Sequence, residues 1–161
     1  MKLVIVADTD QWGASGVGDY SLILTQLLLD RGINVVFEAF KPLVNTNQSL
    51  VDRVRQYDPD WVSLHFVPYI FAIHGFVGRH TLPWQRLRGR LGTNIIFHEL
   101  WIGAHQGASW RHRSVGLLQR FGLHQVLSQL RPELVHCTNP LYSAMLQRAG
   151  IANKLLPLFS S

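Results

Sequence analysis

Polar residues that could take part in chemistry follow several apolar, β-rich runs of the sequence. His65, His98 and His136 each stand at the end of such a run, and Glu99 comes directly after His98. If the runs are parallel strands, their carboxyl ends meet at one edge of the sheet, where ligands bind in open α/β sheets. Three histidines at one edge raise the question of a zinc site, whose ligands must lie within about 2.0–2.3 Å of the metal.

The expected order of the strands argues against a shared metal. In the common order 3-2-1-4-5, the strand ending at His65 lies three positions from the strand ending at His98. At about 4.8 Å per strand, these histidines start roughly 14 Å apart. His98 and His136 end neighbouring strands, but no clear third ligand joins them. We therefore expect no metal. We interpret His65 and His136 as structural and His98, next to the expected switch point and to Glu99, as catalytic together with Glu99.

A glycine-rich loop separates the first strand from the first helix. It begins at Asp8 and ends in Gly16-Val17-Gly18-Asp19-Tyr20. Glycine lets a backbone approach a ligand closely, and a helix N-terminus offers free N–H groups to an anion. We expect these five residues to hold a substrate or a donor phosphate. The alternative is a loop that needs glycine only for its turn.

The same loop permits a second interpretation, as a dinucleotide-binding fingerprint. Gly16-x-Gly18 would be followed by Ser21 as the third small residue, and Glu38 stands where an acid that binds ribose would stand. However, eight residues separate Ala7 from Gly16, whereas the fingerprint places its first glycine almost directly after the strand. A nicotinamide or flavin is therefore an alternative, and we expect no cofactor.

Aromatic and cationic residues follow the fourth expected strand. Trp101 lies in the run 100–105, and Trp110 precedes Arg111 and Arg113. Aromatic faces and guanidinium groups suit stacking on sugars and binding of phosphates, and equally a membrane interface or single-stranded nucleic acid. We expect Trp101, Arg111 and Arg113 to contact an acceptor or an anion. The sequence contains no recognised nucleic-acid-binding motif, so we do not expect nucleic acid as a partner.

Charge is unevenly distributed along the chain. Between Trp61 and Pro132 the only acid is Glu99, and the same stretch has eight arginines, at positions 79, 86, 88, 90, 111, 113, 120 and 131. Such a block suggests an anionic partner, which includes a phosphorylated substrate or a membrane surface. The alternative is a basic face that serves only solubility.

Strand and helix signals alternate along the sequence. We expect strands at 3–7, 33–38, 61–65, 93–98, 134–137 and 154–158, and helices at 17–31, 49–57, 109–129 and 139–149. The segment 68–92 has no clear period, and Gly116 and Gly122 should weaken the third helix. This alternation predicts an α/β fold, a Rossmann-like parallel sheet sandwiched by helices.

Length and composition limit the number of domains and the class of protein. The chain has 161 residues, 47% of them hydrophobic, which is enough for one domain with a core of its own. No apolar run approaches the ~20 residues of a membrane span. The single Cys137 rules out an intramolecular disulfide and fits a reducing compartment. We expect a cytoplasmic protein, with peripheral contact at the inner face of the membrane as an extension.

Several pieces of the sequence, in this order, resemble the N-terminal domain of family-four-like glycosyltransferases of the GT-B fold. They are Gly16-Val17-Gly18-Asp19-Tyr20, Leu28-Leu29-Asp30-Arg31-Gly32, the run 59–69, Phe97-His98-Glu99-Leu100-Trp101, His136-Cys137-Thr138-Asn139 and Leu155-Leu156-Pro157. The resemblance covers essentially residues 1–161.

The resemblance implies transfer of a sugar from a nucleotide-sugar donor, a co-substrate, to an acceptor in a cleft between two Rossmann-like domains. The N-terminal domain mainly holds the acceptor, its first loop reaches the donor phosphates, and the histidine after the fourth strand, here His98, lies at the reaction centre. The second domain binds the donor through paired glutamates in a Glu-x7-Glu-type motif, and this sequence has no such motif. We therefore expect the chain to be inactive alone. A non-catalytic module that binds an anion or a membrane through its arginines is the alternative.

Overall fold

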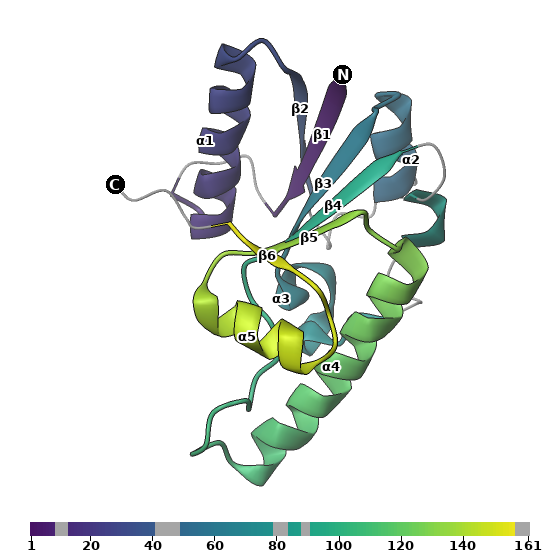
Figure 1. Ribbon diagram of the computed structural model, residues 1–161. Coiled ribbons are helices and arrows are strands. Elements are labelled where there is room, and N and C mark those ends of the chain that lie inside the picture. Colours follow the sequence, from purple (N-terminus) through teal and green to yellow (C-terminus); the bar gives the residue numbers. More distant parts are fainter. Residues whose placement is uncertain (9–12, 41–48, 79–83, 88–90, 157–161) are drawn as a thin grey trace.

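A sheet of six parallel strands is the framework of the fold in the computed structural model of the chain, which describes residues 1–8, 13–40, 49–78, 84–87 and 91–156 (Figure 1). The strands are β1 (Lys2–Ala7), β2 (Asn34–Ala39), β3 (Trp61–Phe66), β4 (Gly92–Phe97), β5 (Leu134–Cys137) and β6 (Lys154–Leu155). The expected Rossmann-like α/β class is confirmed. Of the last expected strand, residues 157 and 158 lie outside the described part of the chain.

The order of the strands differs from the expected one. It is β2-β1-β3-β4-β5-β6, so that β3 pairs with β1 and with β4. The burial patterns give the reason, because β3 is buried at every position after Trp61, whereas only Val35 and Glu38 of β2 are buried. A strand buried on both faces belongs inside a parallel sheet. The reversal of strand order therefore lies between β1 and β3.

Helices connect the strands, and four of them begin at a polar residue that caps the helix. They are α1 (Gly16–Asp30), α2 (Leu50–Gln56), α4 (Trp110–Leu130) and α5 (Pro140–Arg148). The side chains of Ser15, Ser49, Ser109 and Asn139 each accept a hydrogen bond from the backbone N–H three residues on. Such caps fix where a helix begins, which is why the expected bounds hold to within one or two residues. The segment without a clear period contains the short helix α3 (Pro68–Phe71) and the 3₁₀ turns Ile73–Gly75 and Trp84–Leu87.

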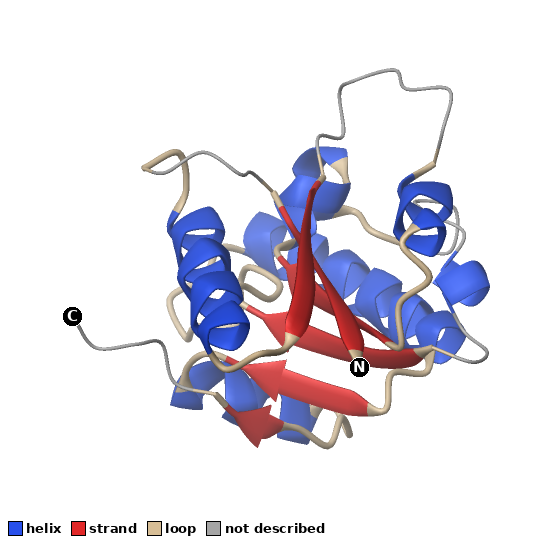
Figure 2. Ribbon diagram, turned by 90° about the horizontal axis from the view of Figure 1, so that it is seen from above, coloured by secondary structure: helices blue, strands red, loops and turns tan. Residues whose placement is uncertain are grey.

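The two faces of the sheet are covered unequally. The connections from β2 to β3, β3 to β4, β4 to β5 and β5 to β6 all run in the same direction across the sheet, so right-handed crossovers place their helices on one face. The connection from β1 to β2 runs in the opposite direction and places α1 on the other face. Leucines, valines and phenylalanines of α2, α3, α4 and α5 share one core with Val4, Leu64 and Phe97. Figure 1 shows α1 and α2 on opposite sides of the strands, and Figure 2 shows the strands in red among these helices. The α1 face carries the histidines discussed below.

Two glycines let α4 pack closely against the backbone of other segments. A Cβ at Gly122 would lie 1.8 Å from the carbonyl oxygen of Val77, and a Cβ at Gly116 would lie 1.9 Å from that of Ile102. Between them, the buried Gln119 accepts a hydrogen bond from Ile102 N at 3.0 Å and donates one to His74 O at 2.9 Å. These glycines, which the sequence presents as weak points of the helix, therefore hold two segments against α4: Gly116 the segment after β4, and Gly122 the segment after β3.

We predict that Gly122→Ala destabilises the protein although alanine favours helix formation. The intrinsic gain of about 1 kcal/mol is outweighed because the Val77 backbone must move, and overpacking of this kind costs about 1–3 kcal/mol. Urea unfolding followed by circular dichroism measures the change. Gly16→Ala in α1 is the matched control, because a Cβ there meets no atom within 4 Å. Equal stability of Gly122→Ala and the parent would contradict this account of the packing.

Candidate functional site

A pocket of about 420 Å³ lies at the carboxyl edge of the sheet, which we call the edge pocket. Parallel strands bring the residues that follow them to this one edge, and the N-terminus of α1 closes it. It is lined by Asp8, Ser15, Gly16, Val17, Val67, Ile70, His98, Glu99 and Thr138. Four residues expected to act together, namely Gly16, Val17, His98 and Glu99, are thus brought to one pocket.

Behind this pocket, a series of side-chain contacts within hydrogen-bond distance joins α1 to the ends of β3 and β4. His65 is completely buried, and its Nδ1 lies 2.6 Å from Ser21 Oγ and 3.2 Å from His98 Nε2. The two histidines meet because His65 pairs with Ile96 on β4, and His98 is the next residue on the same face. The separation of roughly 14 Å expected from the order 3-2-1-4-5 is wrong, because β3 and β4 are neighbours.

The contacts of Ser21 indicate which ring nitrogens carry protons. Ser21 Oγ donates to the carbonyl oxygen of Val17 at 2.7 Å, so it accepts a hydrogen bond from His65 Nδ1–H. His98 Nε2 faces the same N–H and must be an acceptor, which places the proton of His98 on Nδ1. The assignment leaves His65 Nε2 without a hydrogen-bond partner among the described residues. Tyr20 packs edge-on against His98 and at a tilt against His65, with ring centroids 5.2 and 5.7 Å apart.

Burial keeps both histidines neutral at neutral pH. Loss of solvation lowers the pKa of His98 to about 4, although the nearby charge of Asp8 opposes the shift. Loss of solvation, with the adjacent His98, lowers the pKa of His65 to about 3. A general base works best when its pKa is near the working pH. His98 is therefore better suited to hydrogen-bonding a ligand than to removing a proton from it.

Carboxylates supply the remaining polar chemistry of the edge pocket. Glu99 is exposed, whereas Asp8 is half-buried and its Oδ1 has no hydrogen-bond partner among the described residues. A buried carboxylate oxygen without a donor is costly. A ligand hydroxyl placed in the pocket would satisfy it. Lysine and arginine are absent from the described lining of this pocket.

Only part of the glycine-rich loop is free to bind. Gly18 N donates to the capping Ser15 Oγ at 2.8 Å, and Asp19 Oδ1 accepts from Gly13 N at 2.8 Å. Asp19 therefore ties the loop together, and Tyr20 packs on the histidines. The N–H groups of Gly16 and Val17, in the first turn of α1, have no partner within their own helix, and both residues line the pocket. Residues 9–12 of the loop lie outside the described part of the chain.

The predicted aromatic and arginine contacts lie elsewhere. Trp101 and Arg113 line a second pocket, of about 380 Å³, together with Arg120 of α4 and Arg148 of α5; we call it the arginine pocket. The guanidinium of Arg120 lies 5.7 Å from the centroid of Trp101, and Arg113 donates to Gln106 O at 2.6 Å. Arg111 is not in this lining, and its guanidinium lies 5.5 Å from the ring centroid of Trp110.

The remaining arginines of the basic block lie outside both pockets or outside the described residues. Arg86 forms an ion pair with Asp52, and Arg131 caps the end of α4. Arg79, Arg88 and Arg90 lie outside the described residues.

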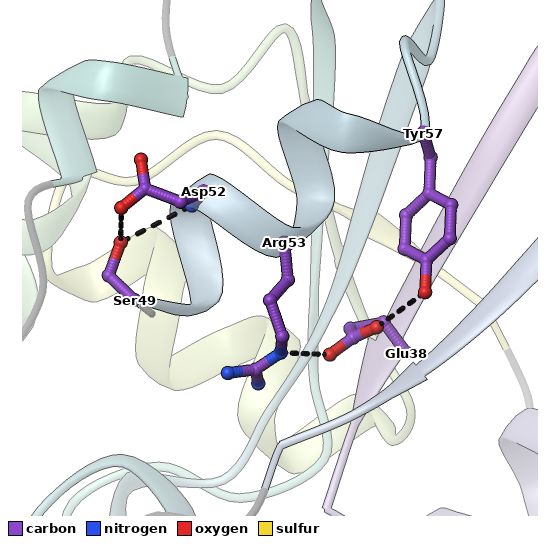
Figure 3. Close-up of polar contacts among 5 residues, drawn as sticks. All are labelled: Glu38, Ser49, Asp52, Arg53 and Tyr57. Atoms are coloured by element: carbon purple, nitrogen blue, oxygen red, sulfur yellow. Dashed lines mark hydrogen bonds and ion pairs between the residues drawn. The ribbon is translucent and has the colours of Figure 1, made fainter. Parts of the chain in front are cut away.

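Glu38, the acid that the dinucleotide interpretation assigns to ribose, is already engaged. It is buried on β2 and accepts hydrogen bonds from Arg53 Nε at 2.6 Å and from the Tyr57 hydroxyl at 3.0 Å (Figure 3). Figure 3 also shows Ser49, the cap of α2, bonded to Asp52. The carboxylate of Glu38 thus docks α2 against β2, and both of its oxygens have partners within the fold.

Four residues support or line these pockets in ways that the sequence did not indicate: His65 and Ser21 behind the edge pocket, and Arg120 and Arg148 in the arginine pocket. The sequence interpretation makes His65 a hydrogen-bonded structural residue; in the structure it is buried and bonded, and its partners, Ser21 and His98, are what the sequence did not indicate. A polar residue four positions after Val17 on the buried side of α1 was the available signal for Ser21. Arg120 lies two turns after Arg113 on the same side of its helix, which was a signal for their proximity. Arg148 belongs to another helix, so no local pattern indicated it.

His136 takes no part in the edge pocket. Its Nδ1 lies 2.8 Å from Asn94 Oδ1, and Asn94 donates to Ser63 Oγ at 3.0 Å, further back on the α1 face. His98 and His136, which end neighbouring strands, therefore do not meet. In the described part of the chain, no group of three or more histidine, cysteine or acidic residues is arranged to hold a metal ion.

Comparison of the chain with protein-family models and with curated proteins found no match. The class that the fold defines is a Rossmann-like α/β protein with a pocket at the carboxyl edge of its sheet. Among the described helices, none combines the length and the hydrophobicity that crossing a bilayer requires.

We predict that stability falls as the pH is lowered from about 6.5 towards 4. In this window the unfolded chain protonates His65 and His98, whereas the folded state, with pKa values of about 3 and about 4, does not. The unfolded state therefore binds more protons, and the free energy of unfolding rises with pH by about 1.4 kcal/mol per pH unit for each proton. Urea unfolding at a series of pH values measures this slope.

Two variants separate titration from hydrogen bonding. His65→Asn retains a polar group near the Nδ1 position but does not titrate, so the slope should fall. Ser21→Ala removes the hydrogen bond, so stability should drop by about 1–3 kcal/mol at every pH while the slope remains. A parent protein with equal stability at both ends of the window would refute the assignment of neutral histidines.

Proposed function

We propose that this chain is the acceptor-binding domain of a glycosyltransferase, which moves a sugar from a nucleotide-sugar donor to an acceptor, and that the edge pocket holds the acceptor sugar. One observation carries the proposal. The neutral ring of His98 stands beside the carboxylates of Asp8 and Glu99 and beside Gly16 and Val17, whose backbone N–H groups open α1 without partners in that helix.

The polar groups of this pocket match a sugar better than a phosphate. Each sugar hydroxyl both donates and accepts a hydrogen bond, and the pocket offers carboxylate acceptors together with N–H donors. A phosphate would face Asp8 and Glu99 without a cationic side chain from the described lining. Val17, Val67 and Ile70 supply apolar surface for the C–H groups of the ring.

Each polar residue has a defined role in the proposed transfer. The acceptor hydroxyl oxygen forms a bond to the anomeric carbon of the donor, and the bond from that carbon to the nucleotide phosphate breaks. The hydroxyl proton passes to a carboxylate, Asp8 or Glu99, because these side chains line the edge pocket beside the hydroxyl and their negative charge attracts the proton as it leaves. His98 orients the sugar through a hydrogen bond, and His65 holds its ring. Nucleotide sugar is a co-substrate, and the mechanism needs no cofactor.

The chain should bind the acceptor without transferring sugar by itself. A nucleotide diphosphate needs cationic or multiple N–H contacts, and the described lining of the edge pocket offers the two amides of α1 and no cationic side chain. The donor must therefore be held mainly by another domain. The resemblance of the sequence to N-terminal GT-B domains supports the same assignment, with the acceptor bound by this domain and the donor by another.

We predict that simple methyl glycosides shift the backbone amide signals of Gly16, Val17 and Glu99 in a titration followed by nuclear magnetic resonance. Affinity should be in the millimolar range, because a single sugar in an open pocket makes few contacts. His98→Ala should weaken binding about tenfold, since it removes one hydrogen bond and the ring beside the sugar. His105→Ala, which changes an exposed histidine outside the pocket, is the matched control.

Three outcomes would contradict the proposal. The first is the absence of shifts around the edge pocket with any glycoside. The second is tighter binding of NAD or a flavin at the same amides, which would favour a dinucleotide-binding domain. The third is release of nucleotide and transfer of labelled sugar by the chain alone, which would overturn the assignment of donor binding to another domain.

A further inference from the structure

The outer face of α4 is an exposed surface with an unusual composition, and we call it the α4 surface. Four large apolar side chains there are mainly in solvent: Trp110 is 73% exposed, Leu117 65%, Leu118 60% and Phe121 63%. At 3.6 residues per turn, Trp110, Leu117 and Phe121 lie within about 40° of one another around the helix axis. They form one stripe, opposite the side that buries Leu123, Val126 and Leu130 in the core.

Arginines border this stripe on both sides. Arg113 and Arg120 follow one border and continue into the arginine pocket, where Arg148 of α5 joins them. Arg111 lies on the other border, beside the ring of Trp110. The ion pairs of the described chain involve none of these four arginines. Their charge is therefore uncompensated by acids of the described fold.

The position of two arginines is unfavourable for the helix itself. The first turn of α4 contains Arg111 and Arg113 and no acid. A helix N-terminus carries a partial positive charge, which favours acids there and disfavours cations. Helix stability therefore gives no reason for this placement, whereas an anionic partner would gain from the arginines and the helix dipole together.

We infer that the α4 surface binds the surface of a membrane that contains anionic lipids. The aliphatic side chains of Leu117 and Leu118 offer a nucleic acid nothing to stack on, but the acyl boundary of a bilayer accepts them together with Phe121. Trp110 suits the headgroup level. Arginines on the borders reach lipid phosphates, as in helices that lie in the membrane plane. The N-terminal end of α4 lies at the lower end of the molecule in Figure 1, away from the sheet.

The inference is independent of the proposed sugar transfer, since it rests on other residues. The edge pocket and the α4 surface have no lining residue in common. A lipid-binding α4 surface would remain if the edge pocket bound no sugar.

Vesicle co-sedimentation of the whole chain tests the inference. With vesicles of phosphatidylcholine and about one-third phosphatidylglycerol we expect binding, and with phosphatidylcholine alone at least tenfold weaker binding. Raising the salt from about 0.05 to 0.5 M should also weaken binding, because exposed charges are screened. Binding that ignores lipid charge and salt, or no binding at all, would overturn the inference.

Variants assign the binding to particular residues. Leu117→Ser with Phe121→Ser should reduce binding at least tenfold, and Arg113→Gln with Arg120→Gln should remove the preference for anionic lipid. Leu29→Ser on α1, where the leucine is 44% exposed, is the matched control and should bind normally. Light scattering identifies the other occupant of such a surface. A dimer that the Leu117 and Phe121 changes abolish, with vesicle binding intact, would assign the surface to a second copy and overturn the inference.

Discussion

The contact between His65 and its two partners fixes the geometry of the candidate site. One ring nitrogen, buried completely, lies within hydrogen-bond distance of Ser21 on α1 and of His98 after β4. This contact requires β3 to lie directly beside β4 and α1 to cover that face of the sheet. The first turn of α1 and the end of β4 are thereby held at opposite sides of one pocket. Because burial also keeps both rings uncharged, the same contact determines what His98 can do there.

Charge separates two surfaces that are close in sequence. The edge pocket combines carboxylates with a neutral histidine, whereas the arginine pocket and α4, which begin only a few residues after Glu99, carry uncompensated positive charge. A single anionic ligand would not suit both. Our proposals therefore give them different partners, a sugar for the first and an anionic membrane for the second. Gln119 and Gly116 of α4 connect them, since they hold the segment after β4 against the helix.

Local signals predicted the elements well, and non-local arrangement was where prediction failed. Capping residues such as Ser15 and Asn139 and the terminator Gly32 mark helix ends in the sequence, so the bounds could be predicted. The residues of a strand do not specify which strands it pairs with. The common order 3-2-1-4-5 therefore places β3 beyond β2, whereas β3 lies between β1 and β4. That one error separated His65 from His98 by roughly 14 Å, so their contact was not predicted. The packing role of Gly116 and Gly122 could not be predicted for the same reason. It depends on the backbones of Ile102 and Val77, which approach these glycines from other segments.

The central claim is that the edge pocket binds a sugar through His98 and the neighbouring carboxylates. A crystal structure of the chain soaked with a methyl glycoside tests it most directly. Our account predicts a sugar ring in the edge pocket, with hydroxyl groups within hydrogen-bond distance of His98 and of Asp8 or Glu99, and with the His65–His98 contact preserved. An empty edge pocket beside a sugar bound at another site would contradict the account.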